Sequence, residues 1–304
     1  MQLSARGMQL GRVLLVLMGT ILVGAGGSKA SELRLLVPAY GNPGNAAGAS
    51  MWTQLTATAS EIGPDLLVIL NPNSGPGVGL IDPNYVNDSA QGAFVDFRNA
   101  GGAAIGYVPT LRAARPLAEV QAEVDLYYDP SYWRGAGVQI DGIFFDEMSN
   151  DLADVGYYET LRDYVRSLSA GALVVGNPGT TFVNNRSGQT TWTVTDYAES
   201  ADIIMSFETI ADEYFNNYTP PVWLDDYPAE RFAHVVYSLP GAQMLQVVGL
   251  ARQRKAGYIY LTEDILDNPY DVLASYWAEQ VEAAQGLIFA DGFESGDFSF
   301  WVQP

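Results

Sequence analysis

The feature that most constrains this chain is a series of eight short apolar runs, which recur from residue 33 onward. The runs are residues 33–40, 66–71, 104–107, 142–145, 173–177, 203–207, 233–237 and 258–261. Most of them are continuously apolar rather than alternating, which is typical of parallel strands that are covered on both faces. Their centres lie about 24 to 38 residues apart, which is the length of one strand and helix. This spacing predicts an α/β protein.

Helix signals between the runs vary in strength. Asp82 before Pro83 predicts a helix start, because an acidic cap precedes a proline at the first helical position. Arg115-Pro116 opens a second stretch, and apolar stripes predict helices over residues 155–168 and 272–281, the latter after Asn268-Pro269. Eight such units predict a single-domain (β/α)8 TIM-type barrel over residues 31–286, with a doubly wound open sheet as the alternative.

The two ends of the chain do not follow this pattern. Residues 1–30 combine two arginines, an apolar run at 13–23 and a small-residue segment that ends at Ala30, which predicts a secretory signal peptide cleaved after Ala30. The apolar run is shorter than the roughly 20 residues that a spanning helix needs. We therefore expect a secreted, extracellular, periplasmic or cell-surface protein without stable membrane insertion. Residues 287–304 form a short C-terminal tail of unknown role.

Composition excludes several kinds of chemistry. The chain has no cysteine and one histidine, His234, so disulfide frameworks, thiol nucleophiles and multi-histidine metal sites are absent. His234 lies near the start of its strand and is expected to be structural. Thirty-five acidic residues against fifteen basic ones give a net charge of -20, which disfavours nucleic acid as a partner. We expect no cofactor and no metal; a calcium or magnesium site at Asp146, Glu147 and Asp264 is an alternative.

Polar side chains gather where the predicted strands end, which is where barrel enzymes carry their active sites. Carboxylates follow three of the strands, aromatic and amide groups follow others, and lysine and arginine do not occur there. This mixture suits a neutral or cationic polyhydroxy ligand such as a sugar, because amides bond hydroxyl groups and rings stack on sugar faces. The candidate substrate-binding residues are Tyr40, Asn71, Asn73, Tyr107, Thr110, Asn177 and Glu263.

The acidic residues after the fourth and sixth strands are the catalytic candidates. Asp146 and Glu147 follow a buried run, and because side chains alternate on a strand, only one of them should face the site while the other braces a neighbour. Glu208 directly follows the sixth run. With strands about 4.8 Å apart, its carboxyl group could approach that of Asp146 to the roughly 5 to 9 Å used by glycosidases. The alternative is that all three acids cap helices.

Five ordered motifs resemble the spherulin-4-like family, which includes glycoside hydrolase family 135. They are LVPAY at 36–40, LNPNSGPG at 70–77, GYVPT at 106–110, DGIFFDE at 141–147 and GNPGT at 176–180. The resemblance covers roughly residues 34 to 265. It implies a barrel hydrolase that acts on α-1,4-linked galactosamine or N-acetylgalactosamine polysaccharide, and we expect endo action.

Carried over by motif, the resemblance implies that Asp146 is the catalytic nucleophile, Glu147 its neighbour in the motif, and Glu208 the general acid/base. Fold does not dictate activity, so a second hypothesis stays open. It is a catalytically silent extracellular protein that binds carbohydrate or matrix at the same site. The polysaccharide is the expected partner in both cases, and the oligomeric state is not predicted.

Overall fold

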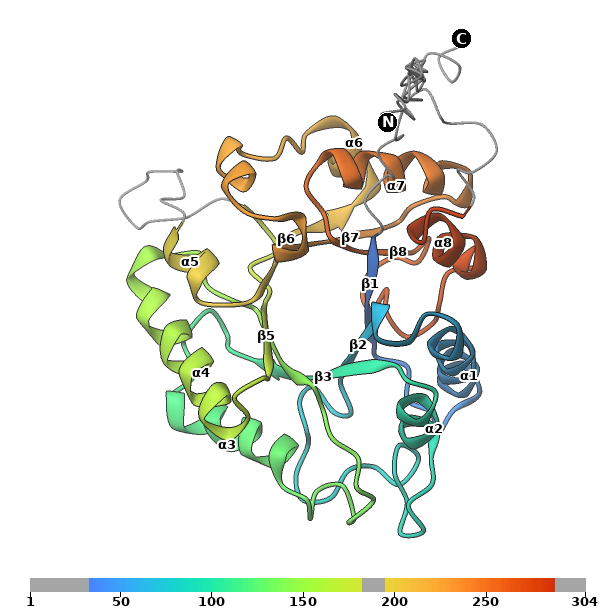
Figure 1. The fold of residues 1–304 in the computed structure, drawn as a ribbon, viewed down its shortest axis with the longest axis vertical. Helices are drawn as coiled ribbons and strands as arrows, with labels where there is room; N and C mark the ends of the chain where they lie inside the picture. Colours follow the sequence, from blue (N-terminus) through green and yellow to red (C-terminus); the bar gives the residue numbers. More distant parts are fainter. Residues whose placement is uncertain (1–32, 182–194, 288–304) are drawn as a thin grey trace, which may run out of the picture.

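The computed structural model describes residues 33–181 and 195–287, which fold into a closed barrel of eight parallel strands (Figure 1). The strands are β1 (Arg34–Ala39), β2 (Leu66–Leu70), β3 (Ala103–Pro109), β4 (Gly142–Asp146), β5 (Leu173–Gly176), β6 (Ile203–Ile210), β7 (Phe232–Tyr237) and β8 (Tyr258–Leu261). Each strand pairs with the next in sequence, and β8 returns to β1 through the pairs Arg34 with Tyr258 and Leu35 with Ile259. The predicted barrel is confirmed, and the open sheet is excluded.

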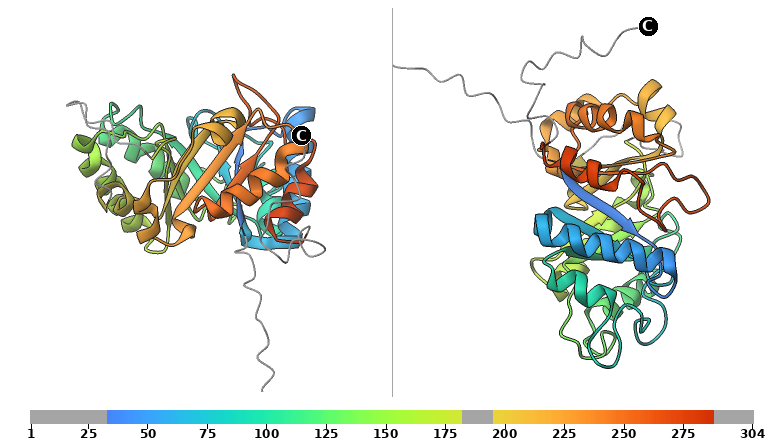
Figure 2. Two further views of the ribbon diagram at one scale, coloured as in Figure 1. Left: turned by 90° about the horizontal axis from the view of Figure 1, so that it is seen from above. Right: turned by 90° about the vertical axis from the view of Figure 1, so that its right-hand side faces the viewer.

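Helices surround the strands on the outside of the barrel (Figure 1). The α-helices are α1 (Ala46–Ile62), α2 (Ala93–Asn99), α3 (Leu117–Tyr128), α4 (Val155–Leu168), α5 (Thr195–Glu199), α6 (Ala211–Asn216), α7 (Met244–Gln253) and α8 (Trp277–Ala284). Short 3-10 helices are η1 (Gly63–Asp65), η2 (Leu152–Asp154), η3 (Val222–Asp226), η4 (Ala229–Arg231) and η5 (Gly241–Gln243). Figure 2 shows α1 and α2 packed side by side along one flank. None of the helices in the described part of the chain is long and apolar enough to cross a membrane.

The prediction of a helix that starts at Asp82-Pro83 is wrong. Asp82 instead accepts a hydrogen bond from the backbone N–H of Asn84 at 2.8 Å, which closes a turn, and α2 begins only after Gly92. Gly92 has a φ of +142°, and a Cβ there would lie 2.3 Å from the carbonyl oxygen of Tyr85. The same side-chain chemistry that caps helices also stabilises isolated turns, and here the turn forms.

The helix predicted over residues 272–281 is shorter than expected. It begins at Trp277, with Tyr276 as its N-cap, and the preceding segment is an irregular loop after β8. The predicted signal peptide and the tail from residue 288 lie outside the described residues. The division of the chain into residues 1–30, 31–286 and 287–304 therefore stays a prediction.

Acidic residues at the start of two strands hold the N-terminal end of the barrel together. Asp141, before β4, accepts a hydrogen bond from the N–H of Ala104 in β3 and pairs with Arg98 of α2. Asp202, before β6, accepts a hydrogen bond from the N–H of Val174 in β5 at 2.8 Å and forms an ion pair with Arg166 of α4. Each aspartate thus satisfies a backbone donor that the ladder leaves open.

His234 lies in β7 with 0% exposure, between the hydroxyl groups of two tyrosines. Tyr214 lies 2.9 Å from its Nδ1 and Tyr218 lies 3.3 Å from its Nε2. Burial, with a smaller contribution from Arg254, lowers the pKa of His234 to about 3, so the imidazole is neutral at ordinary pH. The residue is part of the core, as its position in the sequence predicts.

Candidate active site

Two carboxylates from different strands meet at the C-terminal end of the barrel. Asp146 is the last residue of β4, Glu208 lies in β6, and both are partly exposed. The side-chain nitrogen Nδ2 of Asn177 donates to Oδ1 of Asp146 and to Oε2 of Glu208, each at 2.7 Å. Because both oxygens contact the same nitrogen, they can be no further apart than twice that distance.

The barrel itself places Asn177 between the two acids. Asn177 follows β5, and β5 lies between β4 and β6. Its backbone N–H donates to the carbonyl oxygen of Phe145 at 2.9 Å, and its own carbonyl accepts from Met148 at 2.8 Å. The side-chain oxygen Oδ1 accepts from the N–H of Gly179 at 2.9 Å. This last contact fixes the amide plane so that its NH2 group faces the carboxylates.

A bulge sets the direction of Glu208. The register of β6 against β7 shifts between Met205 and Phe207, and β6 then continues to Ile210. Bulges interrupt the alternation of side chains and redirect the residues that follow. The sequence predicts that this strand ends at residue 207, but it extends to Ile210. Glu208 is therefore held within a strand rather than in a loop.

Two tyrosines donate to the outer oxygens of the pair. The hydroxyl of Tyr107 in β3 donates to Oδ2 of Asp146 at 2.7 Å, and the hydroxyl of Tyr270 donates to Oε1 of Glu208 at 2.6 Å. The ring of Tyr40 lies edge-on to both, with ring centroids 5.6 Å from Tyr107 and 5.5 Å from Tyr270. Three tyrosines, one asparagine and two acids therefore form one continuous network.

The network makes the two acids electrostatically dependent on each other. Burial, and next the charge of Asp146, raise the pKa of Glu208, while the hydrogen bonds from Tyr270 and Asn177 partly oppose this rise. Burial and the charge of Glu208 raise the pKa of Tyr270 far above its ordinary value, so its hydroxyl keeps its proton. Acid/base chemistry requires two neighbouring carboxyl groups in different states, one protonated and one charged. The raised pKa of Glu208 beside the charge of Asp146 fits this requirement.

Glu147 turns away from this network, as the alternation of side chains predicts for one member of the pair. It has a φ of +50° and is exposed, and no hydrogen bond is found between its carboxylate and another described residue. Its backbone carbonyl accepts from Thr110 Oγ1 at 3.0 Å and from the N–H of Arg112 at 2.8 Å. Glu147 braces the neighbouring loop through its backbone, and its charge still acts on Tyr107.

The other predicted binding residues are distributed around the same end of the barrel. Thr110 is 0% exposed, and its hydroxyl donates to the carbonyl of Asp146 at 2.9 Å, so it supports the site from below. Asn71 accepts from the N–H of Gly75 at 2.9 Å and shapes its loop, in which Asn73 is exposed. Glu263 is exposed after β8 and accepts from the N–H of Ser275 at 2.8 Å.

Tyr270 is the residue that sequence reasoning missed. It lies in the loop between β8 and α8, just after Asn268 and Pro269, which we expected to open a helix. A residue in the first turn of a helix outside the barrel would not reach the site. The loop instead runs back over the barrel, where the N–H of Tyr40 donates to the carbonyl of Tyr270 at 3.0 Å.

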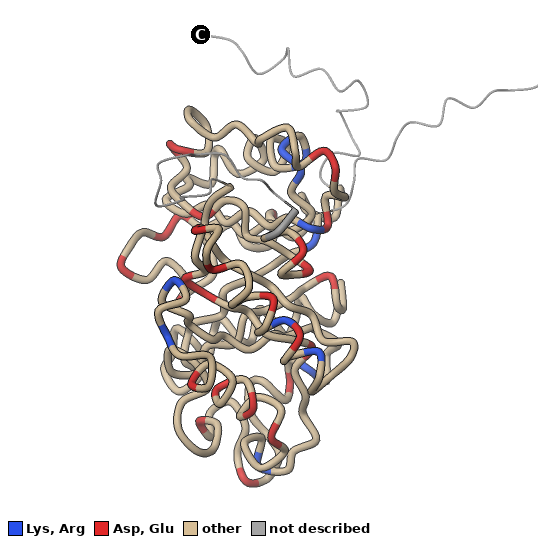
Figure 3. The backbone as a smooth tube through the Cα atoms, turned by 90° about the vertical axis from the view of Figure 1, so that its left-hand side faces the viewer, with Lys and Arg blue, Asp and Glu red and all other residues tan. Residues whose placement is uncertain are grey.

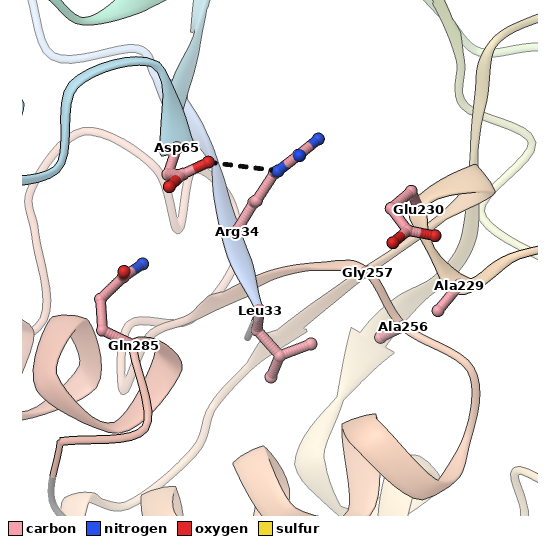
Figure 4. Close-up of a pocket in the computed structure, with 8 residues that line it drawn as sticks. All are labelled: Leu33, Arg34, Asp65, Ala229, Glu230, Ala256, Gly257 and Gln285. Atoms are coloured by element: carbon pink, nitrogen blue, oxygen red, sulfur yellow. Dashed lines mark ion pairs between the residues drawn. The ribbon is translucent and has the colours of Figure 1, made fainter. Parts of the chain in front are cut away.

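Two cavities lie away from the carboxylates. One of about 320 Å³ is at the opposite, N-terminal end of the barrel, where Arg34 pairs with Asp65 at 3.2 Å (Figure 4). The other, of about 640 Å³, lies between α6 and α7. Among residues 33–181 and 195–287, no group of three or more histidine, cysteine or acidic residues is arranged to hold a metal ion.

Comparisons with known proteins identify the family and match the fold. The chain is 26% identical over 272 residues to Spherulin-4 of Physarum polycephalum, which covers 86% of this chain and 72% of that protein. The crystal structure of Aspergillus clavatus Sph3 in complex with GalNAc superimposes with a TM-score of 0.67 at 26% identity, covering 84% of this chain and 99% of Sph3. The sequence profile of Spherulin4, spherulation-specific family 4, matches residues 34–284. The chain therefore belongs to the spherulin-4 family.

Proposed function

We propose that this protein is a glycoside hydrolase that cleaves polysaccharide containing α-1,4-linked galactosamine or N-acetylgalactosamine, acting within the chain. The observation that carries the proposal is the pair Asp146 and Glu208, held by one Asn177 nitrogen at 2.7 Å from each. Paired carboxylates at the ends of barrel strands are the machinery of glycoside hydrolysis. The sugar is suggested by the similarity to Sph3, whose structure holds GalNAc.

In the proposed mechanism, Asp146 attacks the anomeric carbon while Glu208 gives its proton to the glycosidic oxygen, and the sugar–oxygen bond breaks. Water then attacks the resulting glycosyl ester, giving a proton back to Glu208 and releasing the Asp146 carboxylate. The raised pKa of Glu208 suits the group that must start the cycle protonated.

The separation of the acids favours this double displacement. Carboxyl groups about 5 to 5.5 Å apart occur in retaining enzymes, and those about 6.5 to 9.5 Å apart leave room for water in inverting ones. The shared nitrogen limits the facing oxygens to twice 2.7 Å. We therefore assign a retaining mechanism.

The surroundings of the pair support a sugar ligand. Tyr40 and Tyr107 lie beside Asp146, and aromatic rings are common in sites that bind sugars because they stack on C–H faces. Acidic residues are spread over the whole molecule rather than gathered in one patch (Figure 3), and the net charge is -20. Such a charge concentrates a polymer that carries free amines.

Secretion is part of the proposal. The signal peptide predicted in residues 1–30 supports an extracellular, periplasmic or cell-surface location, where such a polymer would be met.

The test is release of reducing ends from a galactosamine-containing polymer. We expect activity in the wild type and a loss of at least about 100-fold in Asp146→Asn and in Glu208→Gln. Glu282→Gln, on the exposed face of α8, is the matched control and should retain activity. Full activity in either active-site variant would contradict the assignment.

One observation favours a silent binding protein as the second candidate. Each of the four oxygens of Asp146 and Glu208 already accepts a hydrogen bond from the protein. A site that is satisfied in this way can bind sugar without cleaving it. Calorimetric binding of galactosamine oligosaccharides, with no product after long incubation, would favour this candidate.

A further inference from the structure

We propose that Asn177 and Tyr270 decide which oxygen of Glu208 carries the catalytic proton: Asn177 keeps the proton off Oε2, and the Tyr270 hydroxyl exchanges between donor and acceptor as the proton leaves and returns on Oε1. The inference rests on the proposed function, because it refines the role of Glu208 as general acid/base. It assigns Tyr270 and Asn177 as positioning residues.

The first step concerns what Asn177 can do. Its NH2 group has two N–H donors and cannot accept, and both donors are used, one by Asp146 Oδ1 and one by Glu208 Oε2. The amide cannot turn over without cost, because its oxygen is held by Gly179. A proton on either facing oxygen would weaken the hydrogen bond that this oxygen accepts from Asn177. The hydrogen bonds therefore favour protonation of the outer oxygens, Oδ2 of Asp146 and Oε1 of Glu208.

The second step concerns the tyrosines at those outer oxygens. A phenol hydroxyl both donates and accepts, so it tolerates a carboxylate or a carboxylic acid opposite it. Tyr270 lies 2.6 Å from Oε1 of Glu208. It can stabilise the ionised form by donating, and by rotating its O–H it can accept from the acid form. No other donor to Oε1 is found among the described residues.

The third step identifies Glu208 as the group that takes the proton. Asp146 on β4 faces it with a like charge. Tyr107 on β3 contacts Asp146, and the ring of Tyr40, which follows β1, lies between those of Tyr107 and Tyr270. On the other side, the phenols of Tyr237 on β7 and Tyr260 on β8 act on Tyr270. No lysine, arginine or histidine is among the groups that act on Glu208. Burial and the neighbouring carboxylate therefore both favour protonation there.

The direct experiment measures the ionisation of Glu208 itself. Protein labelled with carbon-13 at the glutamate carboxyl is titrated by NMR, and the Glu208 signal is identified by its absence in Glu208→Gln. Tyr270→Phe removes a donor to the carboxylate while keeping the ring, so the pKa of Glu208 should rise by about one unit. An unchanged or lowered pKa of Glu208 in a folded Tyr270→Phe protein would overturn the proposal. Thermal melting establishes that the variant is folded.

The matching kinetic experiment separates the two tyrosines. Activity needs Glu208 protonated, so Glu208 sets the alkaline limb of the kcat/KM profile. Tyr270→Phe should move this limb up by about one pH unit. Tyr107→Phe, which removes a hydrogen bond to Asp146 and not to Glu208, and Tyr237→Phe, which leaves both carboxylate hydrogen bonds in place, should leave the limb where it is. A fall in rate with an unmoved alkaline limb in Tyr270→Phe would show a purely structural role and overturn the proposal.

The two experiments also separate this inference from the proposed function. A wild type that binds sugar but releases no product contradicts the hydrolase. The NMR titration still tests whether Tyr270 controls the ionisation of Glu208, because it needs no turnover. A shifted pKa without turnover supports this role of Tyr270 and contradicts only the catalytic role of Glu208.

Discussion

Asp146 and Glu208 accept hydrogen bonds from a single nitrogen atom, although β5 separates their strands in the barrel. The bridging amide belongs to that intervening strand, so the spacing of the acids follows from the order of strands and from one side chain. This arrangement leads to the following expectations about the reaction and the stability of the fold.

The stereochemistry of hydrolysis should be retention. An α-linked substrate should release α-configured product first, because the spacing of the acids suits a covalent intermediate. Proton NMR of the anomeric signal in the first minutes of reaction, before mutarotation, measures this. Initial appearance of the β anomer would contradict the double displacement.

Azide should restore activity to alanine variants of both acids, and the two variants should give glycosyl azides of opposite anomeric configuration. In Asp146→Ala, azide takes the place of the nucleophile and should give the β-glycosyl azide from an activated α-substrate. In Glu208→Ala, azide attacks the glycosyl ester in place of water and should give the α-glycosyl azide. Product configuration is read by NMR, and the same azide anomer from both variants would show that the two roles are assigned wrongly.

His234 should make the fold less stable in acid. Its pKa is about 3 in the folded protein and 6.5 when free, so the unfolded chain binds more protons between these values. Wild-type stability should therefore fall as pH drops below 6.5, by up to about 1.4 kcal/mol per pH unit from this residue. Urea unfolding of wild type and His234→Gln over this range measures the difference.

The comparison is clean because the chain has a single histidine. The variant should be less stable than the wild type near neutral pH, since it disturbs the contacts with Tyr214 and Tyr218. Its deficit should shrink as the pH falls. A deficit that stays constant with pH would mean that His234 does not titrate between the two states.

Ala113→Gly should stabilise the protein. Leu111, Arg112 and Ala113 have φ values of 46°, 54° and 63°, a conformation that costs a residue with a Cβ about 1 to 2 kcal/mol. Relief of this cost should raise the free energy of unfolding by roughly 1 kcal/mol. Ala118→Gly, at an exposed position of α3, is the matched control and should lower it by about 1 kcal/mol. Equal losses in both variants would contradict the strain argument.

The strands could be predicted because burial on both faces leaves continuous apolar runs. The carboxylates, Tyr107 and Asn177 could be found because each directly follows or ends such a run. Tyr270 could not, since its loop has no period and Asn268-Pro269 is equally compatible with a helix start. Asp82-Pro83 misled for the same reason, because an aspartate side chain closes a turn as readily as it caps a helix.

The position of Asn177 before a proline also affects its chemical stability against deamidation. Asparagine side chains are usually lost when the next backbone N–H nitrogen attacks them to form a succinimide, and the product is an aspartate. The residue after Asn177 is Pro178, whose nitrogen carries no hydrogen. Chemical conversion of the amide, which would insert a third negative charge between Asp146 and Glu208, is blocked by the residue that follows it.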